Sequence, residues 1–199
     1  MLYAFLKITF QLLFRIVFRA RVIGKENLPE TGAVILAANH MSNWDPPFLA
    51  CFMRRHVAYM AKEELFEPPV FGPAIRACHA FPVKRGAADR AAIKTAVQVL
   101  KLGHCLGLFP EGTRSRTGKM RKAEAGVGLI VAMTGAPVVP AAIVGTDKNF
   151  ANGGFLPQLT VCVGKPMHFT GDRKNKEELA AFSQSILDEI ARMKQELQK

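Results

Sequence analysis

The sequence predicts an α/β fold, in which a mostly parallel, mixed sheet is flanked by helices and preceded by an amphipathic helical segment. From residue 26 onward, short and almost continuously apolar runs alternate with segments of helical period, which is typical of strands buried on both faces of a parallel sheet. Apolar residues make up 49% and charged residues 22% of the 199 residues, which are ordinary values for a globular protein. A chain of this length buries a sizeable core without disulfides or metals. We therefore expect a helical segment over residues 1–25 and one α/β domain over residues 26–199.

The first 25 residues carry five basic side chains and no acidic one, around a strongly apolar stretch. Cations interrupt this stretch, so neither a cleaved signal peptide nor a simple membrane-spanning helix is expected. The polar residues recur at every fourth position and would form one narrow stripe on a helix, which consists of Lys7, Gln11, Arg15 and Arg19. The pattern predicts a helix in the membrane interface, with its apolar side in the lipid and its basic residues among the headgroups. The alternative is an amphipathic helix packed on the domain's own core.

Six apolar runs are predicted to form strands, at residues 33–38, 57–60, 81–83, 105–109, 138–144 and 159–163. Helices are predicted between and after them, at residues 46–53, 89–102, 124–134 and 176–197. Asp45 is expected to cap the first of these helices, with Pro46 at its first position, and Asp89 is expected to cap the second. Asn175 and Glu178 resemble a capping box at the start of the last helix.

The chain carries 27 basic and 16 acidic side chains, a formal net charge of +11. Such a protein is attracted to polyanions, which include nucleic acid, an anionic membrane surface and phosphorylated substrates. Nucleic acid is not expected, because few aromatic residues interleave with the cations and no RNP-like run occurs. The four cysteines are widely spaced among apolar neighbours, which predicts reduced thiols in the core. Motifs for a metal, a phosphate-binding glycine loop and a GxSxG nucleophile are missing from the sequence, so neither a metal nor a bound organic cofactor is expected.

The segment that follows the first predicted strand contains two candidates for acid–base chemistry. His40 suits proton removal near neutral pH, and Asp45 could hold the imidazole in one tautomer by accepting its other ring N–H. Residues five positions apart do not share a helical face, so the two side chains meet only if the chain turns between them, as the predicted strand–loop–helix junction would allow. The alternative is that Asp45 only caps the helix and His40 is an ordinary loop histidine. Both roles can coexist if one carboxylate oxygen caps and the other binds His40.

A basic loop follows the fourth predicted strand, from Pro110 to Arg116. Its cations, Arg114 among them, lie between turn residues, where a guanidinium can bind phosphate oxygens in a bidentate manner. Glu111 in this loop could orient an arginine or accept a hydrogen bond from a substrate hydroxyl. The alternative is a solvated basic loop with a structural Glu–Arg pair. Arg85, which follows the third predicted strand, is uninformative by itself.

These loops together resemble the four sequence blocks of the glycerolipid acyltransferase superfamily. The blocks occur in the family's order over residues 39–143, and the third is highly specific, whereas the HxxxxD pattern of the first is weak alone. The short chain with an amphipathic N-terminus is most similar to the bacterial 1-acylglycerol-3-phosphate acyltransferases. The matching segments are Asn39-His40 with Asp45, Phe81–Arg85, Phe109–Arg116 and Val138–Ile143.

The resemblance implies transfer of a fatty acyl group from an acyl thioester to the free hydroxyl of lysophosphatidic acid, which gives phosphatidic acid. His40 would deprotonate that hydroxyl, and Asp45 would orient His40. The alkoxide would attack acyl-CoA or acyl-carrier protein, which is a co-substrate, without a cofactor, a metal or a covalent acyl-enzyme. The residues implied to bind the acceptor are Arg85, Glu111, Gly112, Thr113, Arg114 and Arg116.

Other functions stay open at this point. The acceptor could be glycerol-3-phosphate or another lysolipid, and a remote alternative is a non-catalytic, basic membrane-binding module. The leading hypothesis places the chain in phospholipid biosynthesis at the cytoplasmic face of the cell membrane, as a peripheral or monotopic protein. Its partners would be lysophosphatidic acid, the acyl donor and an anionic membrane surface.

Overall fold

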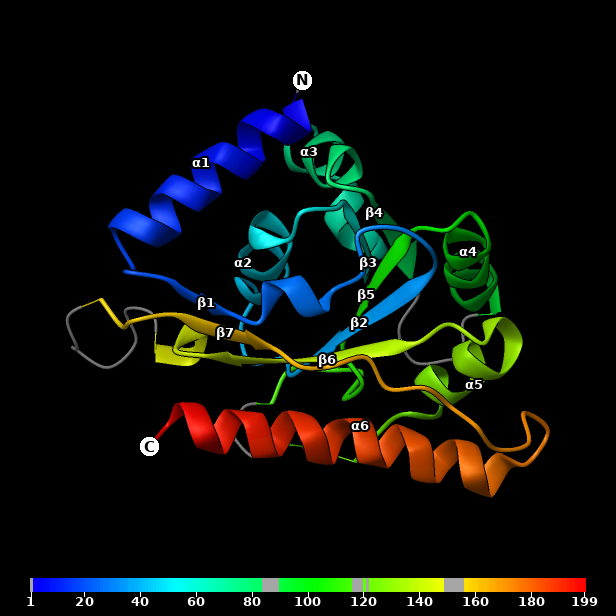
Figure 1. Ribbon diagram of the computed structural model, residues 1–199. Helices are drawn as coiled ribbons and strands as arrows, with labels where there is room; N and C mark the ends of the chain where they lie inside the picture. Colours follow the sequence, from blue (N-terminus) through cyan, green and yellow to red (C-terminus); the bar gives the residue numbers. More distant parts are fainter. Residues whose placement is uncertain (1, 84–89, 116–119, 121, 149–155) are drawn as a thin grey trace.

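The structure, a computed structural model, describes residues 2–83, 90–115, 120, 122–148 and 156–199 of the chain (Figure 1). Its centre is a seven-stranded sheet with the order β1-β7-β6-β2-β5-β3-β4. Neighbouring strands are parallel, except that β6 and β7 are antiparallel. This arrangement confirms the predicted α/β fold with a mostly parallel, mixed sheet. The strands are β1 (Arg21–Ile23), β2 (Val34–Ala38), β3 (Val57–Lys62), β4 (Ala80–Val83), β5 (Cys105–Leu108), β6 (Val138–Val144) and β7 (Thr160–Val163).

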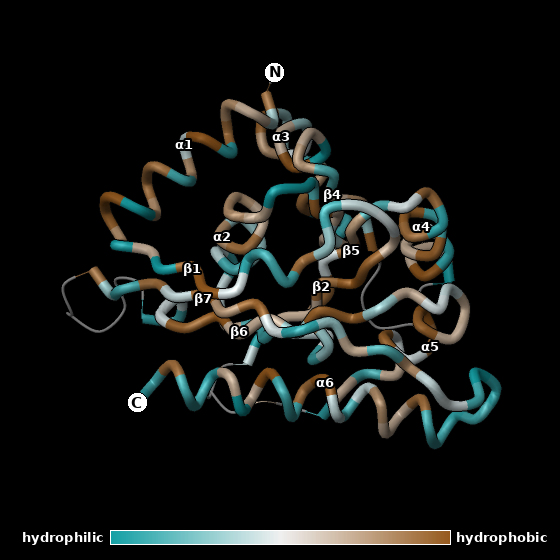
Figure 2. The backbone as a smooth tube through the Cα atoms, viewed as in Figure 1, coloured by the Kyte–Doolittle hydropathy of each residue, from teal (hydrophilic) through white to brown (hydrophobic). Residues whose placement is uncertain are grey.

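Strand β2 shows why the apolar runs of the sequence are continuous. Val34, Leu36 and Ala38 belong to the core on one face of the sheet. Ile35 and Ala37 belong to the core on the other face, because successive side chains of a strand point to opposite sides. All five are fully buried, so this strand has no polar side and its sequence no alternation. Figure 2 accordingly shows β2 mostly in the brown of hydrophobic residues.

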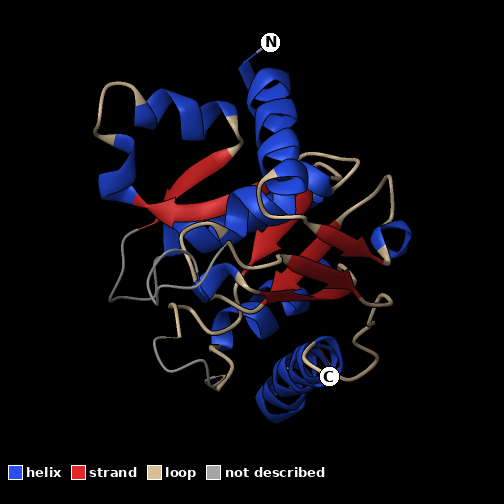
Figure 3. Cartoon of the chain, turned by 90° about the vertical axis from the view of Figure 1, so that its left-hand side faces the viewer, coloured by secondary structure: helices blue, strands red, loops and turns tan. Residues whose placement is uncertain are grey.

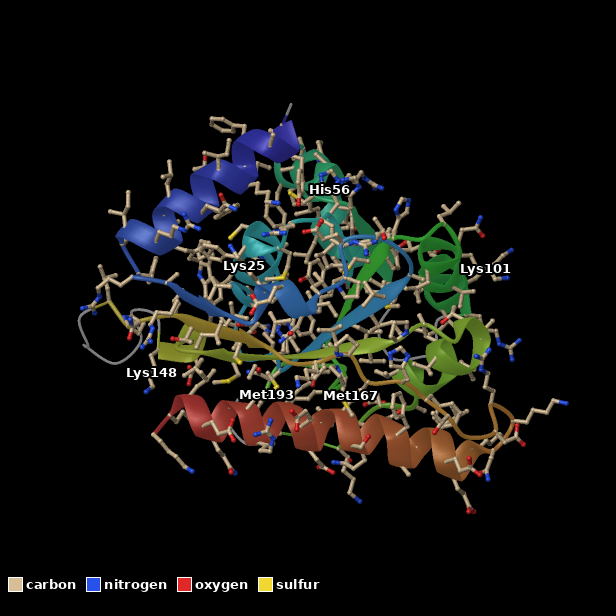
Figure 4. All side chains as sticks on the ribbon, viewed as in Figure 1. Lys25, His56, Lys101, Lys148, Met167 and Met193 are labelled. Carbon is tan, nitrogen blue, oxygen red and sulfur yellow. The ribbon has the colours of Figure 1, made fainter. Side chains whose placement is uncertain are left out.

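Helices cover both faces of the sheet. Helix α1 and helix α6 lie on opposite sides of it, and the C-terminal helix is seen nearly end-on in Figure 3. Met193 of α6 is buried between that helix and the sheet (Figure 4). The helices are α1 (Leu2–Ile16), α2 (Asp45–Phe52), α3 (Phe71–Ala77), α4 (Arg90–Lys101), α5 (Ala125–Thr134) and α6 (Lys176–Leu197), with short 3-10 helices at Lys25–Asn27, Glu63–Phe66 and Thr146–Lys148.

The last helix begins as the sequence predicts. Asn175 caps α6, since its Oδ1 accepts the backbone N–H groups of Glu177 and Glu178 at 3.0 and 3.3 Å. Glu178 in turn accepts a hydrogen bond from the side-chain amide of Asn175 at 2.7 Å, whereas the usual capping box uses the backbone N–H. The bounds of α6 and β6 are those predicted, because long or wholly apolar segments carry the strongest pattern.

One strand and one α-helix of the structure were not predicted. Strand β1 has only three residues, too few to show a period, and pairs with β7 at the sheet edge. Helix α3 contains Gly72 and Pro73, which weaken the helical pattern. Asp89, the predicted cap of α4, lies outside the described residues. The division of the chain at residue 25 stays a prediction, although β1, which falls within its first part, is a strand of the sheet.

All four cysteines are free thiols. Cys51 and Cys105 are buried, as predicted, and burial raises the pKa of each thiol to about 12. Cys162 is half-buried and packs against the core, whereas Cys78 is half-buried and belongs to neither core cluster, so the prediction of a core position was wrong for Cys78.

Helix α1 turns part of its polar stripe toward the protein. The Lys7 ammonium donates to the carbonyl oxygen of Met53 at 2.6 Å, and the Gln11 amide donates to that of Cys51 at 2.5 Å. These carbonyls lie at the C-terminal end of α2, where the last turn of a helix leaves its acceptors without intrahelical partners. The prediction that Lys7 lies among lipid headgroups was therefore wrong in this structure.

The outward face of α1 is apolar. Phe14 of α1 and Phe18, just after it, are buried in the core, so the helix also packs on the core, as the alternative interpretation of the sequence had it. A row of large apolar side chains nevertheless remains exposed. Within the described parts of the chain, no helix is both long and apolar enough to cross a membrane. The exposed row consists of Leu2, Phe5, Ile8, Leu12 and Ile16 of the helix and of Val17 directly after it.

Candidate active site

The candidate site lies where the parallel neighbours β2 and β5 end. The loop after β2, residues 39–44, leads into α2, and the loop after β5 begins at Phe109. Carboxyl ends of parallel strands meet at the same edge of a sheet, and functional groups of α/β folds gather there. The topology therefore joins two segments that are separated by about seventy residues in the sequence.

His40 and Asp45 are in contact. Nδ1 of His40 lies 2.9 Å from Oδ2 of Asp45, whose side chain is fully buried, whereas the His40 side chain is 12% exposed. A carboxylate can only accept, so Nδ1 carries the proton in this hydrogen bond and Nε2 is left as the basic nitrogen. The turn that the sequence analysis required between the two residues is therefore present.

The carboxylate of Asp45 also accepts hydrogen bonds from the loop that precedes it. The backbone N–H groups of Met41 and Ser42 donate to the same Oδ2 at 2.6 and 2.7 Å. Asp45 is the first residue of α2 and Trp44 its N-cap, so the prediction that Asp45 caps the helix was wrong. The chain turns back before α2, which brings N–H groups from outside the helix, rather than from its first turn, to this oxygen.

The loop after β5 holds the backbone of His40. Glu111 is buried, and its Oε1 accepts the backbone N–H of His40 at 3.2 Å. The backbone N–H of Ser115 donates to the carbonyl oxygen of His40 at 2.8 Å. The structure thus gives Glu111 a supporting contact with His40, which the sequence did not predict. Its predicted role in binding the acceptor stays a prediction.

Asn39 fixes the end of β2 just before His40. Its side-chain amide donates to the carbonyl oxygen of Ile143 at 2.9 Å, and its Oδ1 accepts the N–H of Ile143 at 2.7 Å. Asn39 is buried, and it pairs with the backbone of β6 as a peptide group would. A polar residue directly after a wholly apolar strand was the sequence signal for such a position.

Of the remaining residues predicted to bind the acceptor, three lie within the described part of the chain and two outside it. Gly112 adopts a φ of 66°, and a Cβ at this position would lie 2.8 Å from Cγ of Glu124, so both conformation and space favour glycine. Thr113 is half-buried, and Arg114 is exposed in the same loop as Ser115. Arg85 and Arg116 lie outside the described residues.

Two contacts of the site were missed by the sequence analysis. The ring of Phe109 stacks on the imidazole of His40, with centroids 4.0 Å apart and planes inclined by 18°. Lys194 of α6 is nearly buried, and its Nζ lies 3.2 Å from Sδ of Met41 in the loop that carries His40. Phe109 begins the third family-like block, but it was interpreted as the end of a strand, and Lys194 lies in the predicted last helix. Neither was therefore given a role in the site.

A histidine with an Asp-held tautomer can act as a general base on a hydroxyl group, and the nearby basic loop can bind an anionic group. Within the described ranges, no group of three or more His, Cys, Asp or Glu side chains is arranged to hold a metal ion.

Comparison with known proteins identifies the class of protein that this fold and site define. The model of the family described as "Acyltransferase" matches residues 19–144. The chain therefore belongs to the acyltransferase family, which confirms the resemblance seen in the sequence.

The named relatives are more specific. The 1-acyl-sn-glycerol-3-phosphate acyltransferase of Bacillus subtilis is 32% identical, over 89% of this chain and 89% of that protein. The chloroplastic 1-acyl-sn-glycerol-3-phosphate acyltransferase LPAT1 of Arabidopsis thaliana is 29% identical, over 76% of this chain but only 44% of that protein. The chain thus spans most of the bacterial relative and less than half of the plant one.

A solved structure is similar over almost the whole chain. The crystal structure of the 1-acyl-sn-glycerophosphate (LPA) acyltransferase PlsC of Thermotoga maritima superposes with a TM-score of 0.78 at 31% sequence identity. The match covers 99% of this chain and 78% of that one.

Proposed function

We propose that the protein transfers a fatty acyl group from an acyl thioester to the free hydroxyl of lysophosphatidic acid, which gives phosphatidic acid in phospholipid biosynthesis. The observation that carries this proposal is the contact between His40 and Asp45, at 2.9 Å, next to a basic loop. Named relatives of the family act on the same acceptor.

In the proposed reaction, Nε2 of His40 removes the proton of the acceptor hydroxyl. The oxygen forms a bond to the thioester carbonyl carbon, the carbon–sulfur bond breaks, and the departing sulfur takes the proton from the imidazolium. Asp45 keeps the proton on Nδ1 and stabilises the positive charge that His40 acquires. No step requires a covalent acyl-enzyme, a metal or a bound cofactor.

The phosphate of the acceptor is proposed to bind at the loop after β5. Arg114 is exposed there, beside the residue that donates to the His40 carbonyl oxygen. A guanidinium binds phosphate oxygens in a bidentate manner, which would place the acceptor hydroxyl near His40. Thr113, Glu111 and the backbone of Gly112 are further candidates for binding the acceptor in this loop. Arg85 and Arg116 are candidates from the sequence alone.

The substrate is proposed to reach the site from a membrane surface. The exposed apolar row of α1 suits the lipid side of an interface, and the net charge of +11 suits an anionic one. Trp44, the N-cap of α2, packs its ring against Phe10 and Phe14 of α1, so α1 lies beside the site. We place the protein on the cytoplasmic face of the cell membrane, where acyl-CoA and acyl-carrier protein are available.

The decisive experiment is thiol release from palmitoyl-CoA, with and without lysophosphatidic acid, by the wild type and by His40→Ala. Release that requires both the acceptor and His40 supports the proposal, and we expect His40→Ala to lower turnover at least about a hundredfold. Turnover near wild type in His40→Ala would refute His40 as the base. Parallel assays with acyl-carrier protein as donor, and with glycerol-3-phosphate or another lysolipid as acceptor, identify the substrates.

A further inference from the structure

Two aromatic rings are stacked in sequence behind the imidazole of the candidate base. The imidazole of His40 stacks on Phe109, and Phe109 stacks on Tyr59 of β3, with centroids 5.9 Å apart and planes inclined by 19°. We call His40, Phe109 and Tyr59 the ring column. The planes of neighbouring rings are inclined by only 18° and 19°, so each ring limits the movement of the next.

A glycine allows the far end of this column to form. Tyr59 is opposite Gly107 in the register of β3 and β5. A Cβ on Gly107 would lie 2.2 Å from Cε1 of Tyr59, so the tyrosine ring rests on the bare backbone of the neighbouring strand. Phe109, the first residue after β5, follows Gly107 by two positions and packs against the same core cluster as Tyr59. The tyrosine ring is thereby placed in line with Phe109.

The far end of the column is firmly held. Tyr59 is 6% exposed, and it belongs to the core cluster that also contains Phe48 and Phe52 of α2. Burial raises the pKa of Tyr59 well above its ordinary value, so the hydroxyl is neutral at physiological pH. The column thus offers His40 a rigid, uncharged aromatic face.

The hydrogen bond between His40 and Asp45 does not by itself fix the orientation of the imidazole. It fixes one edge of the imidazole through Nδ1, but the ring can still tilt about that edge and move Nε2. A ring stacked 4.0 Å away blocks this tilt on one side. Small displacements matter, because a misplacement of 1 Å in an active site can lower the rate about a hundredfold.

We propose that Phe109 and Tyr59 are positioning residues, which hold the imidazole of His40 at the angle needed for proton transfer, and that Gly107 provides the space that aligns Tyr59. The proposal rests on the proposed function of His40 as the base. Neither Tyr59 nor Gly107 lies in any of the segments that resemble the family blocks.

The first test compares Tyr59→Leu, which removes the ring, with Tyr59→Phe, which retains it. We expect Tyr59→Leu to lower kcat about tenfold at an unchanged acceptor KM, and Tyr59→Phe to recover most of that loss. Leu100→Ala is the matched control, since Leu100 is buried in the core on the opposite face of the sheet. It should lower the thermal midpoint without lowering kcat of the folded enzyme.

Three results would overturn the proposal: wild-type kcat in Tyr59→Leu, an equal loss in Tyr59→Phe, or an equal loss in Leu100→Ala. Gly107→Ala gives a second test from the other strand, with Gly126→Ala as control, because a Cβ on Gly126 meets nothing within 4 Å. We expect a lower kcat only in the Gly107 variant. If this variant does not fold, Phe109→Leu, at a half-buried position, takes its place with the same expectation.

A nuclear magnetic resonance measurement needs no activity and separates this proposal from the proposed function. The ring current of Phe109 should shift the carbon-bound imidazole protons of His40 upfield, and His40→Gln assigns these signals among the five histidines. Phe109→Leu should remove the shift, and Tyr59→Leu should alter it. Unchanged His40 signals in Tyr59→Leu would refute the column even in an active enzyme. An inactive wild type that shows the shifts would refute only the function.

Discussion

Asn39 and Ile143 exchange two hydrogen bonds, side chain to backbone, at the point where β2 ends and the loop of His40 begins. The donor and acceptor of Ile143 are buried with the side chain of Asn39, so water cannot replace it. One residue therefore continues the pairing of β2 with β6 and fixes the starting point of the catalytic loop.

Asn39→Leu should destabilise the fold, because it leaves the N–H and the carbonyl of Ile143 buried without partners. We expect a loss of about 1–3 kcal/mol in the free energy of unfolding, measured by urea denaturation. Asn27→Leu is the control, since Asn27 is half-buried and makes one side-chain hydrogen bond, to the carbonyl oxygen of Val163 at 2.9 Å. A smaller loss in Asn39→Leu than in Asn27→Leu would contradict this reading.

Asp45→Asn should remove the charge and keep the shape. An asparagine oxygen can still accept the N–H groups of Met41 and Ser42, but it does not stabilise the imidazolium form of His40. We expect kcat to fall at least about a hundredfold with an unchanged circular dichroism spectrum. Asp188→Asn, at an exposed position on α6, should retain wild-type turnover. Comparable turnover in the two variants would show that the carboxylate of Asp45 has no role in the reaction.

Arg114→Ala should weaken binding of the acceptor. The loss of one charge-assisted hydrogen bond predicts a rise of at least about tenfold in the KM for lysophosphatidic acid, with little change for the acyl donor. Lys101→Ala removes an exposed cation from α4 instead and should leave both constants unchanged (Figure 4). An effect of Arg114→Ala on the donor alone would place the phosphate site elsewhere.

The outward face of α1 should determine binding to lipid. Phe5→Asp places a charge in the exposed apolar row, where Phe5 is 66% exposed, and should weaken cosedimentation with vesicles of phosphatidylglycerol and phosphatidylcholine. Leu102→Asp changes a side chain directly after α4 that is 65% exposed, so it adds the same charge at matched exposure. Equal loss of binding in both variants would indicate a general charge effect rather than insertion of α1.

The fold should lose stability in mild acid. His56 (Figure 4) is exposed, but its ring packs against those of Tyr3 of α1 and His79. Partial desolvation and the neighbouring His79, Lys7 and His104 lower its pKa. Unfolded His56 titrates near 6.5, so below this pH the unfolded state binds more protons than the folded state.

The free energy of unfolding should therefore decline as the pH falls from about 6.5 toward the lower pKa of the folded state. We expect His56→Phe, which keeps a ring beside Tyr3, to decline less between pH 7.5 and 5.5 in urea titrations. His168→Gln, at an exposed position elsewhere, should follow the wild type. A pH profile of His56→Phe that matches the wild type would contradict the assignment.

Local pattern was enough to predict elements that are long or wholly apolar. The apolar stripe of α6 and its Asn175 cap could be predicted from residue spacing, because a helix makes its backbone hydrogen bonds within itself. Strand β6 could be predicted because its run of residues is wholly apolar. Strand β1 exists only because β7 lies beside it, and three residues carry no period of their own. The sequence also did not determine which side of α1 faces the protein. That side depends on the carbonyl oxygens at the end of α2, which accept hydrogen bonds from Lys7 and Gln11, and no local pattern in the sequence indicates this contact.

The sequence by itself determined the class of fold, the family, and the candidates His40, Asp45 and Arg114, because these follow from composition, apolar runs and short motifs. The tertiary structure alone decided how the residues meet. It joined the amide groups of Met41 and Ser42 to one carboxylate oxygen, and it placed the distant strand residue Tyr59 behind Phe109. The physical reason is that strand order, register and the turn before α2 set these contacts, and each depends on segments far apart in the chain.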